Sequence, residues 1–416
     1  MGTAANVANV PQILKNIWEN DIFDFMYEDQ PFLGLVEKDT SWDGLYQILT
    51  VEYGGMAGRS AAFSNAQTNK SPPKYKQMQI LTRDNFALWS VDHKLITLSR
   101  NDRGALVRAL AESTEKAMSK LKHSSCWAFW RNGGGAVGRV ASIAGSTITL
   151  TDKNDIRNFD LDDVIDLSAD DGTGGAGVRA GTSLTISGLD EDTGIITFTA
   201  GVVASIALAA ANDYLFHNGD YNAMFYGVLS YVTPSAPGTG GVPAAVWGMD
   251  RTDFPTRLAG SRFTGSASAP ETAIKSALAT AHRRKIKTTH LFATPEIYNT
   301  IEANLGANRR YIDEKVGSVG YRALEFTSQG GNTVKLYSDA DIPKTPAGTG
   351  HYVFGLNMDE WKFHTADEYP MWLATVANGG NKFMLEVNAN QSEGRLGGYG
   401  QLYTRAPGQH FVLTLT

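Results

Sequence analysis

The chain has 416 residues, of which 42% are hydrophobic and 19% charged, with 37 lysines and arginines against 43 aspartates and glutamates. At about 150 residues per domain this length suggests two or three domains with real cores, which excludes a globally disordered chain. A net charge of −6 argues against a dedicated nucleic-acid binder, and the single cysteine, Cys126, excludes an intrachain disulfide and an all-cysteine metal site.

The N-terminal segment, residues 1–44, is predicted to be an extended arm. Its short apolar stretches, interrupted by Pro11 and Pro31, are too apolar for a solvated tail, so we expect the arm to lie on a surface. It begins without a basic region and apolar run, which argues against a signal peptide. The longest near-apolar run, 201–211, is far shorter than the ~20 residues that cross a bilayer. We therefore expect a soluble intracellular product without a membrane partner.

A long two-stranded ribbon is predicted next. The run LYQILTVEY at 45–53 is rich in β-branched and aromatic residues, a polar tip with glycines follows, and a second extended run covers 75–91. At ~3.3 Å per residue each strand could reach about 30 Å, and such a ribbon is marginal in water unless a face is covered. We expect the ribbon to lie on another subunit.

The longest helix is predicted over 99–131. Ser99 or Asn101 can cap its start, and apolar residues recur at helical spacing. Its end is predicted at Asn132, because three glycines follow and glycine accepts the left-handed conformation that closes a helix. Cys126 lies in the aromatic sequence SSCWAFW and is predicted to be a buried structural thiol.

An acidic module interrupts the chain at 134–220. Residues 133–220 hold 13 acidic and 4 basic side chains, a net charge of −9, so the remaining chain carries +3. Short alternating stretches such as STITLT and GIITFTA are separated by turns rich in glycine and aspartate. This pattern predicts a small all-β barrel inserted into the chain.

The remaining segments predict a mixed α+β body. After a linker rich in proline and glycine, Pro270 begins a helix over 269–285, the strand THLFAT follows, and Thr294 caps a second helix that ends at Gly306. Further strands are predicted at 334–338, 351–355, 383–388 and 410–415.

No motif predicts catalysis, so we expect neither an enzyme nor a cofactor. The eight histidines lack the spacings of metal sites, and no serine lies in GxSxG. The glycine-rich segment 172–183 has Thr182 where a phosphate loop needs lysine, and HRRK at 282–285 suits a helix C-terminus. Six aspartates of the insert could bind Ca²⁺ but lack EF-hand spacing, so a solvated acidic face is favoured. They are Asp160, Asp162, Asp163, Asp166, Asp170 and Asp171.

The order of these segments resembles the major capsid proteins of tailed bacteriophages, which have the HK97-type fold. The stretch GVLSYVTPSAPGTGGVPAAVWG resembles their linker, TTHLFATPEIYNTIEANL their axial A-domain, and FMLEVNANQSEGRLGGYG the return strands of their P-domain. The implied divisions are an N-terminal arm at 1–44, an E-loop and the start of the P-domain at 45–98, the P-domain spine helix at 99–133, an inserted β-barrel at 134–220, a P-domain linker at 221–268, an A-domain at 269–365 and P-domain return strands at 366–416.

The resemblance implies a structural protein that assembles as hexamers and pentamers into an icosahedral head around double-stranded DNA. Each E-loop would lie across a neighbour's spine helix. The implied partners are other copies of the chain, a separate scaffolding protein, a portal, a decoration protein and packaged DNA held by weak nonspecific contact. The implied location is the virion capsid, assembled in the host cytoplasm. The candidate interface residues are Trp18, Phe23, Phe25 and Tyr27 in the arm, and Arg59, Phe63, Lys70, Lys74 and Tyr75 at the ribbon tip.

Two other kinds of protein remain open at the level of sequence. An encapsulin-type nanocompartment shell has the same fold, although the acidic insert and the long glycine- and proline-rich linkers favour a phage protein. From a different class, the chain could be a hydrolase whose site forms only in space, or an adhesin with a β-rich binding insert.

Overall fold

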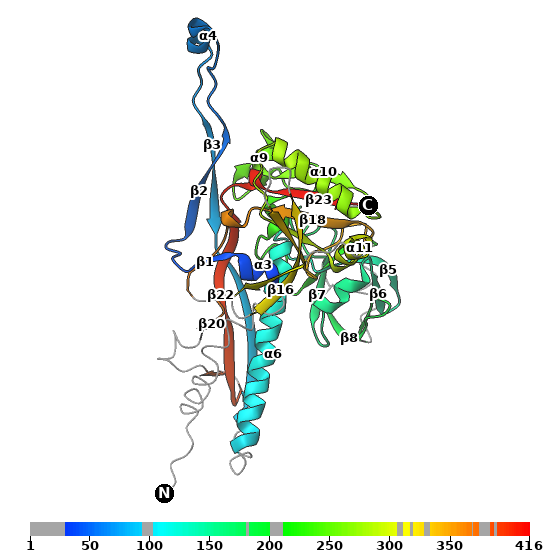
Figure 1. Ribbon diagram of the computed structural model, residues 1–416. Helices are drawn as coiled ribbons and strands as arrows, with labels where there is room; N and C mark the ends of the chain where they lie inside the picture. The colour runs from blue at the N-terminus through cyan, green and yellow to red at the C-terminus, as the bar shows by residue number, and fades with distance from the viewer. Residues whose placement is uncertain are drawn as a thin grey trace.

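In the computed structural model one long helix extends from a body of sheets and shorter helices (Figure 1). The described residues are 30–93, 103–179, 183–199, 211–305, 311–316, 319–327, 333–367, 369–373, 383–386 and 389–416. The arm residues Trp18, Phe23, Phe25 and Tyr27 lie outside them. Among the helices of the described ranges, none combines the length and apolar character that crossing a bilayer requires.

A two-stranded ribbon projects from the body (Figure 1). Strands β2 (Tyr46–Gly54) and β3 (Lys74–Leu81) pair antiparallel, and the short helix α4 (Phe63–Thr68) lies at the tip. The hairpin is shorter than the sequence pattern predicts, because the second extended run divides at Thr82. The residues after Thr82 form a separate strand, which joins the sheet described next.

The first sheet has six strands, and the long helix α6 (Arg103–Trp130) packs on one of its faces. Its order is β1-β19-β22-β20, and both β4 and β21 pair with the long strand β22. Met118 and Leu121 of the helix pack against Leu396 of β22 in a buried cluster. The strands are β1 (Glu37–Asp39), β4 (Arg83–Asp92), β19 (Trp361–Thr365), β20 (Met371–Trp372), β21 (Phe383–Leu385) and β22 (Gln391–Thr404).

The predicted long helix is confirmed over its described part. It ends where the sequence indicates, because Gly133 follows with a positive φ of 80°. The capping residues Ser99 and Asn101 lie outside the described ranges. Cys126 is buried, as predicted.

The second sheet has seven strands in the order β13-β23-β18-β14-β17-β16-β15. Two helices, α10 (Pro270–Arg283) and α11 (Pro295–Leu305), contribute Ile274, Leu278 and Ile301 to its core. The last strand, β23, differs from the predicted grouping with the return strands, because it pairs between β13 and β18. The strands are β13 (Ser261–Gly265), β14 (His290–Ala293), β15 (Tyr311–Val316), β16 (Val319–Thr327), β17 (Thr333–Ser338), β18 (His351–Leu356) and β23 (Phe411–Leu415).

The predicted insert forms a closed barrel in the order β10-β5-β6-β9-β8-β7, beside α11 and the second sheet (Figure 1). Its interior is filled by fully buried aliphatic side chains such as Ile165, Leu167, Ile186 and Ile196. The first and last strands, β5 and β10, pair with each other, so the six described strands of the barrel leave no open edge. The strands are β5 (Gly138–Ala144), β6 (Thr147–Leu150), β7 (Val164–Ser168), β8 (Leu184–Asp190), β9 (Ile195–Phe198) and β10 (Tyr214–His217).

One aromatic cluster joins the two sheets and the long helix. Phe32, in the short helix α3 (Pro31–Leu35), lies 4.7 Å from Trp130, whose ring lies 5.4 Å from Phe354 of β18. Trp361 of β19 contacts Phe32 at 6.0 Å. All four side chains are fully buried, so the two sheets share one core. The remaining short elements are η3 (Lys153–Asn158), α8 (Val228–Tyr231), β11 (Ala245–Val246), β12 (Met249–Asp250), α9 (Pro255–Leu258), η5 (Met358–Glu360) and η6 (Pro407–Gln409).

Candidate functional site

The two faces of the ribbon differ in exposure. On the inner face Met78 and Ile80 are buried, whereas on the outer face Tyr46, Ile48 and Leu81 are 49%, 52% and 42% exposed. The register places Tyr46 directly opposite Leu81, so these outer side chains are neighbours across the ribbon. Because the side chains of a strand alternate between its faces, one face rests on the body while the other presents uncovered apolar surface.

The ribbon tip carries the five described candidate residues, Arg59, Phe63, Lys70, Lys74 and Tyr75, and all are exposed. Phe63 is 82% exposed and Tyr75 55%. No residue between Glu52 and Gln77 is buried in the chain. The structure brings the five residues together at one end of the molecule, and their contact with another subunit stays a prediction.

The base of the ribbon is held by polar contacts with the linker. Lys76 forms an ion pair with Asp253 at 2.7 Å, and its ammonium also donates to the Asp250 carbonyl at 2.7 Å. The backbone amide of Gln79 donates to the Trp247 carbonyl at 3.0 Å. The linker around β12 therefore fixes where the ribbon leaves the body.

A second uncovered apolar surface lies on the first sheet, opposite α6. Phe86 and Leu88 of β4 are 45% and 56% exposed, and Tyr399 of β22 is 38% exposed. The rings of Phe86 and Tyr399 meet edge to face at 5.9 Å. We did not predict this surface from the sequence. A signal was available, because in NFALWSV apolar residues occupy both alternating positions, which indicates that both faces of the strand are apolar.

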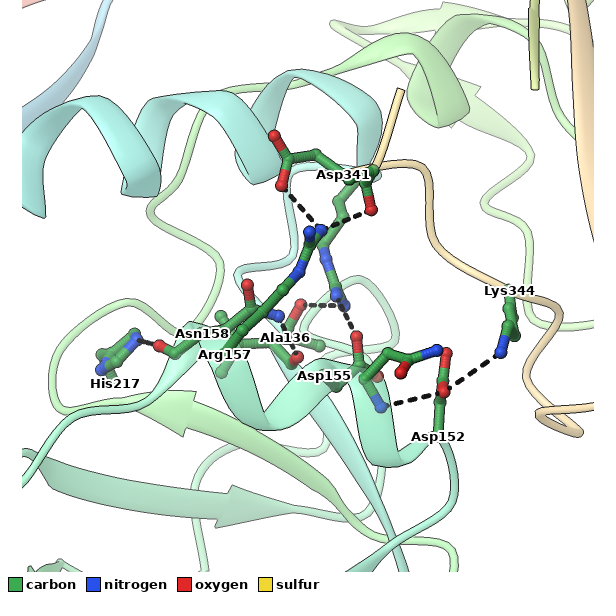
Figure 2. A network of polar contacts seen from close by, with 12 residues as sticks. Ala136, Asp152, Asp155, Arg157, Asn158, His217, Asp341 and Lys344 are labelled. Atoms are coloured by element: carbon green, nitrogen blue, oxygen red, sulfur yellow. Dashed lines mark hydrogen bonds and ion pairs between the residues drawn. The ribbon is translucent and has the colours of Figure 1, made fainter. Parts of the chain in front are cut away.

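The barrel is fastened to the body by ion pairs that converge on η3 (Figure 2). Arg157 pairs with Asp341 at 2.7 Å, and Arg131 at the end of α6 pairs with Asp155 at 2.9 Å. Lys344 lies 3.3 Å from Asp152, just before η3. Because three separate contacts link the insert to α6 and to the segment after β17, the barrel is a fixed part of the subunit.

A buried carboxyl lies beside this junction. Asp339 is 2% exposed, and one of its oxygens accepts the backbone amide of Asp341 at 2.9 Å. Burial and the nearby Asp341 charge raise the pKa of Asp339 to about 7. His123, on α6, is half-buried near Asp341 and Arg157, and desolvation by its surroundings lowers its pKa.

We expect Asp339→Asn to remove a pH dependence of stability. In the folded chain the Asp339 carboxyl keeps its proton up to about pH 7. In the unfolded chain the same carboxyl loses its proton near pH 3.8, the ordinary pKa of an aspartate. The folded state therefore binds more protons between these values, and its stability falls as pH rises through them. Between pH 5 and pH 8 the wild type should lose about 2.5 kcal/mol from this group, and the variant should not.

Urea unfolding of both proteins at pH 5 and pH 8 measures this difference. Asp192→Asn, at an exposed position of the barrel, is the control and should retain the wild-type pH dependence. Equal pH dependence in Asp339→Asn and wild type would contradict the prediction.

The predicted acidic face of the insert is only partly solvated. Asp160 and Asp162 are exposed, but Asp166 is 5% exposed and accepts hydrogen bonds from Ser183 at 2.8 Å and Asn218 at 3.0 Å. The prediction of a solvated side chain is wrong for Asp166, because its carboxylate accepts hydrogen bonds from two segments of the barrel that are distant in sequence. Within the described ranges no three histidine, cysteine or acidic side chains group in a way that could hold a metal ion.

Comparison with known proteins finds similarity only among solved structures, because no family model and no curated protein matches the chain. The capsid asymmetric unit of cyanophage A-1(L) has a TM-score of 0.48 at 12% identity, covering 92% of this chain and 91% of that one. The capsid of a native GTA particle has a TM-score of 0.42 at 9% identity, covering 100% and 92%. The holo-SrpI encapsulin complex of Synechococcus elongatus has a TM-score of 0.40 at 10% identity, covering 92% and 87%. Tailed-phage capsids, which the sequence resembles, are thus among the similar structures.

Proposed function

We propose that the chain is the major capsid protein of a tailed bacteriophage, with an HK97-type fold. The observation that carries this proposal is the pair of uncovered apolar surfaces, one on the outer face of a ribbon that projects from the body and one on the first sheet. A soluble monomer rarely exposes such surfaces, and a ribbon of two strands needs a partner for its open face. Repeated contact between copies supplies that partner.

The two surfaces are suited to each other across neighbouring copies. The outer ribbon face carries Tyr46, Ile48 and Leu81, and the sheet face carries Phe86 and Leu88. In such a contact the aromatic and aliphatic side chains would interleave and become buried away from solvent. The contact joins different surfaces of two copies, so it is heterologous and continues from copy to copy until a ring or shell closes.

The assembled particle would follow the segment order of the capsid family. Residues 45–81 would act as the E-loop, α6 as the spine helix of the P-domain, and the second sheet with α10 and α11 as the A-domain at the local symmetry axes. Hexamers and pentamers would build an icosahedral head around double-stranded DNA. The other partners in this proposal are a scaffolding protein, a portal and a decoration protein, and assembly takes place in the host cytoplasm.

Electron microscopy and size-exclusion chromatography of the purified full chain test the proposal. We expect shells or capsomers, either alone or with the scaffolding protein of the same phage. A stable monomer at every concentration, even beside that scaffolding protein, would overturn it. Particles that hold an enzyme cargo in place of DNA would assign the shell to an encapsulin instead.

We expect Leu88→Lys to prevent shell formation while the subunit stays folded. Leu88 is 56% exposed, so a lysine there should change the stability of the monomer little. In the assembled contact, however, the lysine ammonium would lose its hydration without gaining a partner. Leu161→Lys is the matched control, because Leu161 is also 56% exposed but lies on the barrel. Negative-stain images of both variants give the result, and normal shells from Leu88→Lys would exclude the sheet face as an interface.

A further inference from the structure

A cleft of about 560 Å³ opens where the barrel, the end of α6, the linker and the segment after β17 meet. This volume is in the range of small-molecule sites. Its walls include Arg139 and Tyr214 from the barrel, Trp247 and Arg251 from the linker, and Lys344 and Tyr352 from the body. Two of the ion pairs at the barrel junction, Asp152 with Lys344 and Asp155 with Arg131, belong to its lining.

The carboxylates of the cleft already have partners. Asp152 lies 3.3 Å from Lys344, and Asp155 lies 2.9 Å from Arg131. Asp170 accepts the backbone amide of Ala176 at 2.7 Å, and Asp171 accepts the Asn132 amide at 2.6 Å. These four acidic groups are therefore neutralised or satisfied within the walls.

Two guanidinium groups of the cleft lack an acidic partner among the described residues. Arg251 is 1% exposed and donates only to the carbonyls of Ser230, at 2.6 Å, and Pro243, at 2.8 Å. Its Nε is buried without a hydrogen-bond partner in the described chain. Arg139 donates to the carbonyls of Asn212 and Pro346. A buried cation without a counter-charge is costly, and an anion in the cleft would relieve that cost.

The other walls of the cleft are aromatic. The rings of Tyr226 and Trp247 lie 4.3 Å apart, and the Arg139 guanidinium lies 5.4 Å from the ring centre of Tyr214. Planar rings of this kind pack against an aromatic or aliphatic body. The cleft thus offers positive charge and apolar contact together.

We propose that this cleft binds a small organic anion, an aromatic or apolar body that bears one carboxylate or sulfonate group. The acidic group would be attracted by the positive charge that Arg139 and Arg251 give the cleft, and the body would lie against Tyr226 and Trp247. The site goes beyond the proposed function, because a shell subunit needs no ligand there. Trp247 also holds the ribbon through the amide of Gln79, so the ligand would contact the wall that fixes the ribbon base.

Titration of the purified full chain with 8-anilinonaphthalene-1-sulfonate tests the site, because this dye is aromatic, anionic and fluorescent in apolar surroundings. We expect one dye per chain. Ala245→Phe, which adds a ring to the cleft wall, should weaken binding at least tenfold. Its matched control is Ala244→Phe, the adjacent exposed position outside the cleft, which should bind like wild type. Arg139→Gln should weaken binding about tenfold, and Arg139→Lys less.

Two further measurements separate this site from the exposed ribbon face. Ile48→Ser should leave the dye affinity unchanged, and N-phenyl-1-naphthylamine, the neutral analogue, should bind at least tenfold more weakly. Circular dichroism checks that each variant is folded. If Ala245→Phe is not folded, the dye affinity of Arg139→Gln decides the test. Unchanged affinity in Arg139→Gln, equal affinity for the neutral dye, or loss of binding in Ile48→Ser would each overturn the proposal.

Discussion

Replacing residues 55–73 with Asn-Gly should abolish shells and leave a folded, soluble subunit. Gly54 and Lys74 are paired across the ribbon, so a two-residue turn can close the shortened hairpin between them. None of the removed residues is buried, and the free energy of unfolding should therefore change by no more than about 0.5 kcal/mol. The expected loss of assembly arises because α4 and the tip residues Arg59, Phe63 and Lys70 disappear together.

Negative-stain microscopy and thermal unfolding of the shortened chain give the two readouts. In a companion variant, residues 55–73 are replaced by a glycine and serine segment of equal length. This variant distinguishes the effect of the length of the ribbon from the effect of the side chains at its tip. We expect it to fail as well, because its tip lacks the apolar and charged groups. Normal particles from the Asn-Gly variant would show that the ribbon tip does not join subunits.

Trp130→Ala should destabilise the subunit by about 3–5 kcal/mol, the usual cost of removing a large aromatic side chain from a core. Trp130 is fully buried and contacts Phe32, Phe292 and Phe354, with ring centres 4.7, 5.3 and 5.4 Å away. Its removal would leave a cavity at the point where α6, α3 and the second sheet meet. A total stability of about 5–15 kcal/mol is typical for a domain, so this loss is large.

Chemical denaturation measures the change, with Phe63→Ala as the control. Phe63 is 82% exposed at the ribbon tip, and its truncation should shift stability by less than about 0.5 kcal/mol. Similar small shifts for both variants would mean that the aromatic cluster does not join the two sheets as its geometry indicates.

Features set by neighbouring residues were predictable from sequence. The end of α6 follows from Asn132 and the glycines after it, and Pro270 begins α10 as expected. The barrel was predictable because short alternating strands, tight turns and a local excess of acid occur within one segment. The exposure of the ribbon tip likewise follows from the polar sequence between two strongly β-forming runs.

Features set by residues distant in sequence were not predictable. The strand after Thr82 leaves the ribbon because β22, about 300 residues later, offers it a longer partner, and no local pattern indicates this. Arg157 and Asp341 are 184 residues apart in the sequence, so neither can be distinguished locally from an ordinary surface charge. The burial of Asp166 has the same origin, since its partner Asn218 comes 52 residues later in the sequence.

The pairing of β5 with β10 has a consequence for how this chain could have arisen. Gly138 lies opposite Leu215, so the chain enters the barrel and leaves it at adjacent positions. A segment with adjacent ends can be acquired or lost in a single genetic event without altering the path of the surrounding chain. The contacts of η3 with the body would then be later additions that turned an acquired module into part of the subunit.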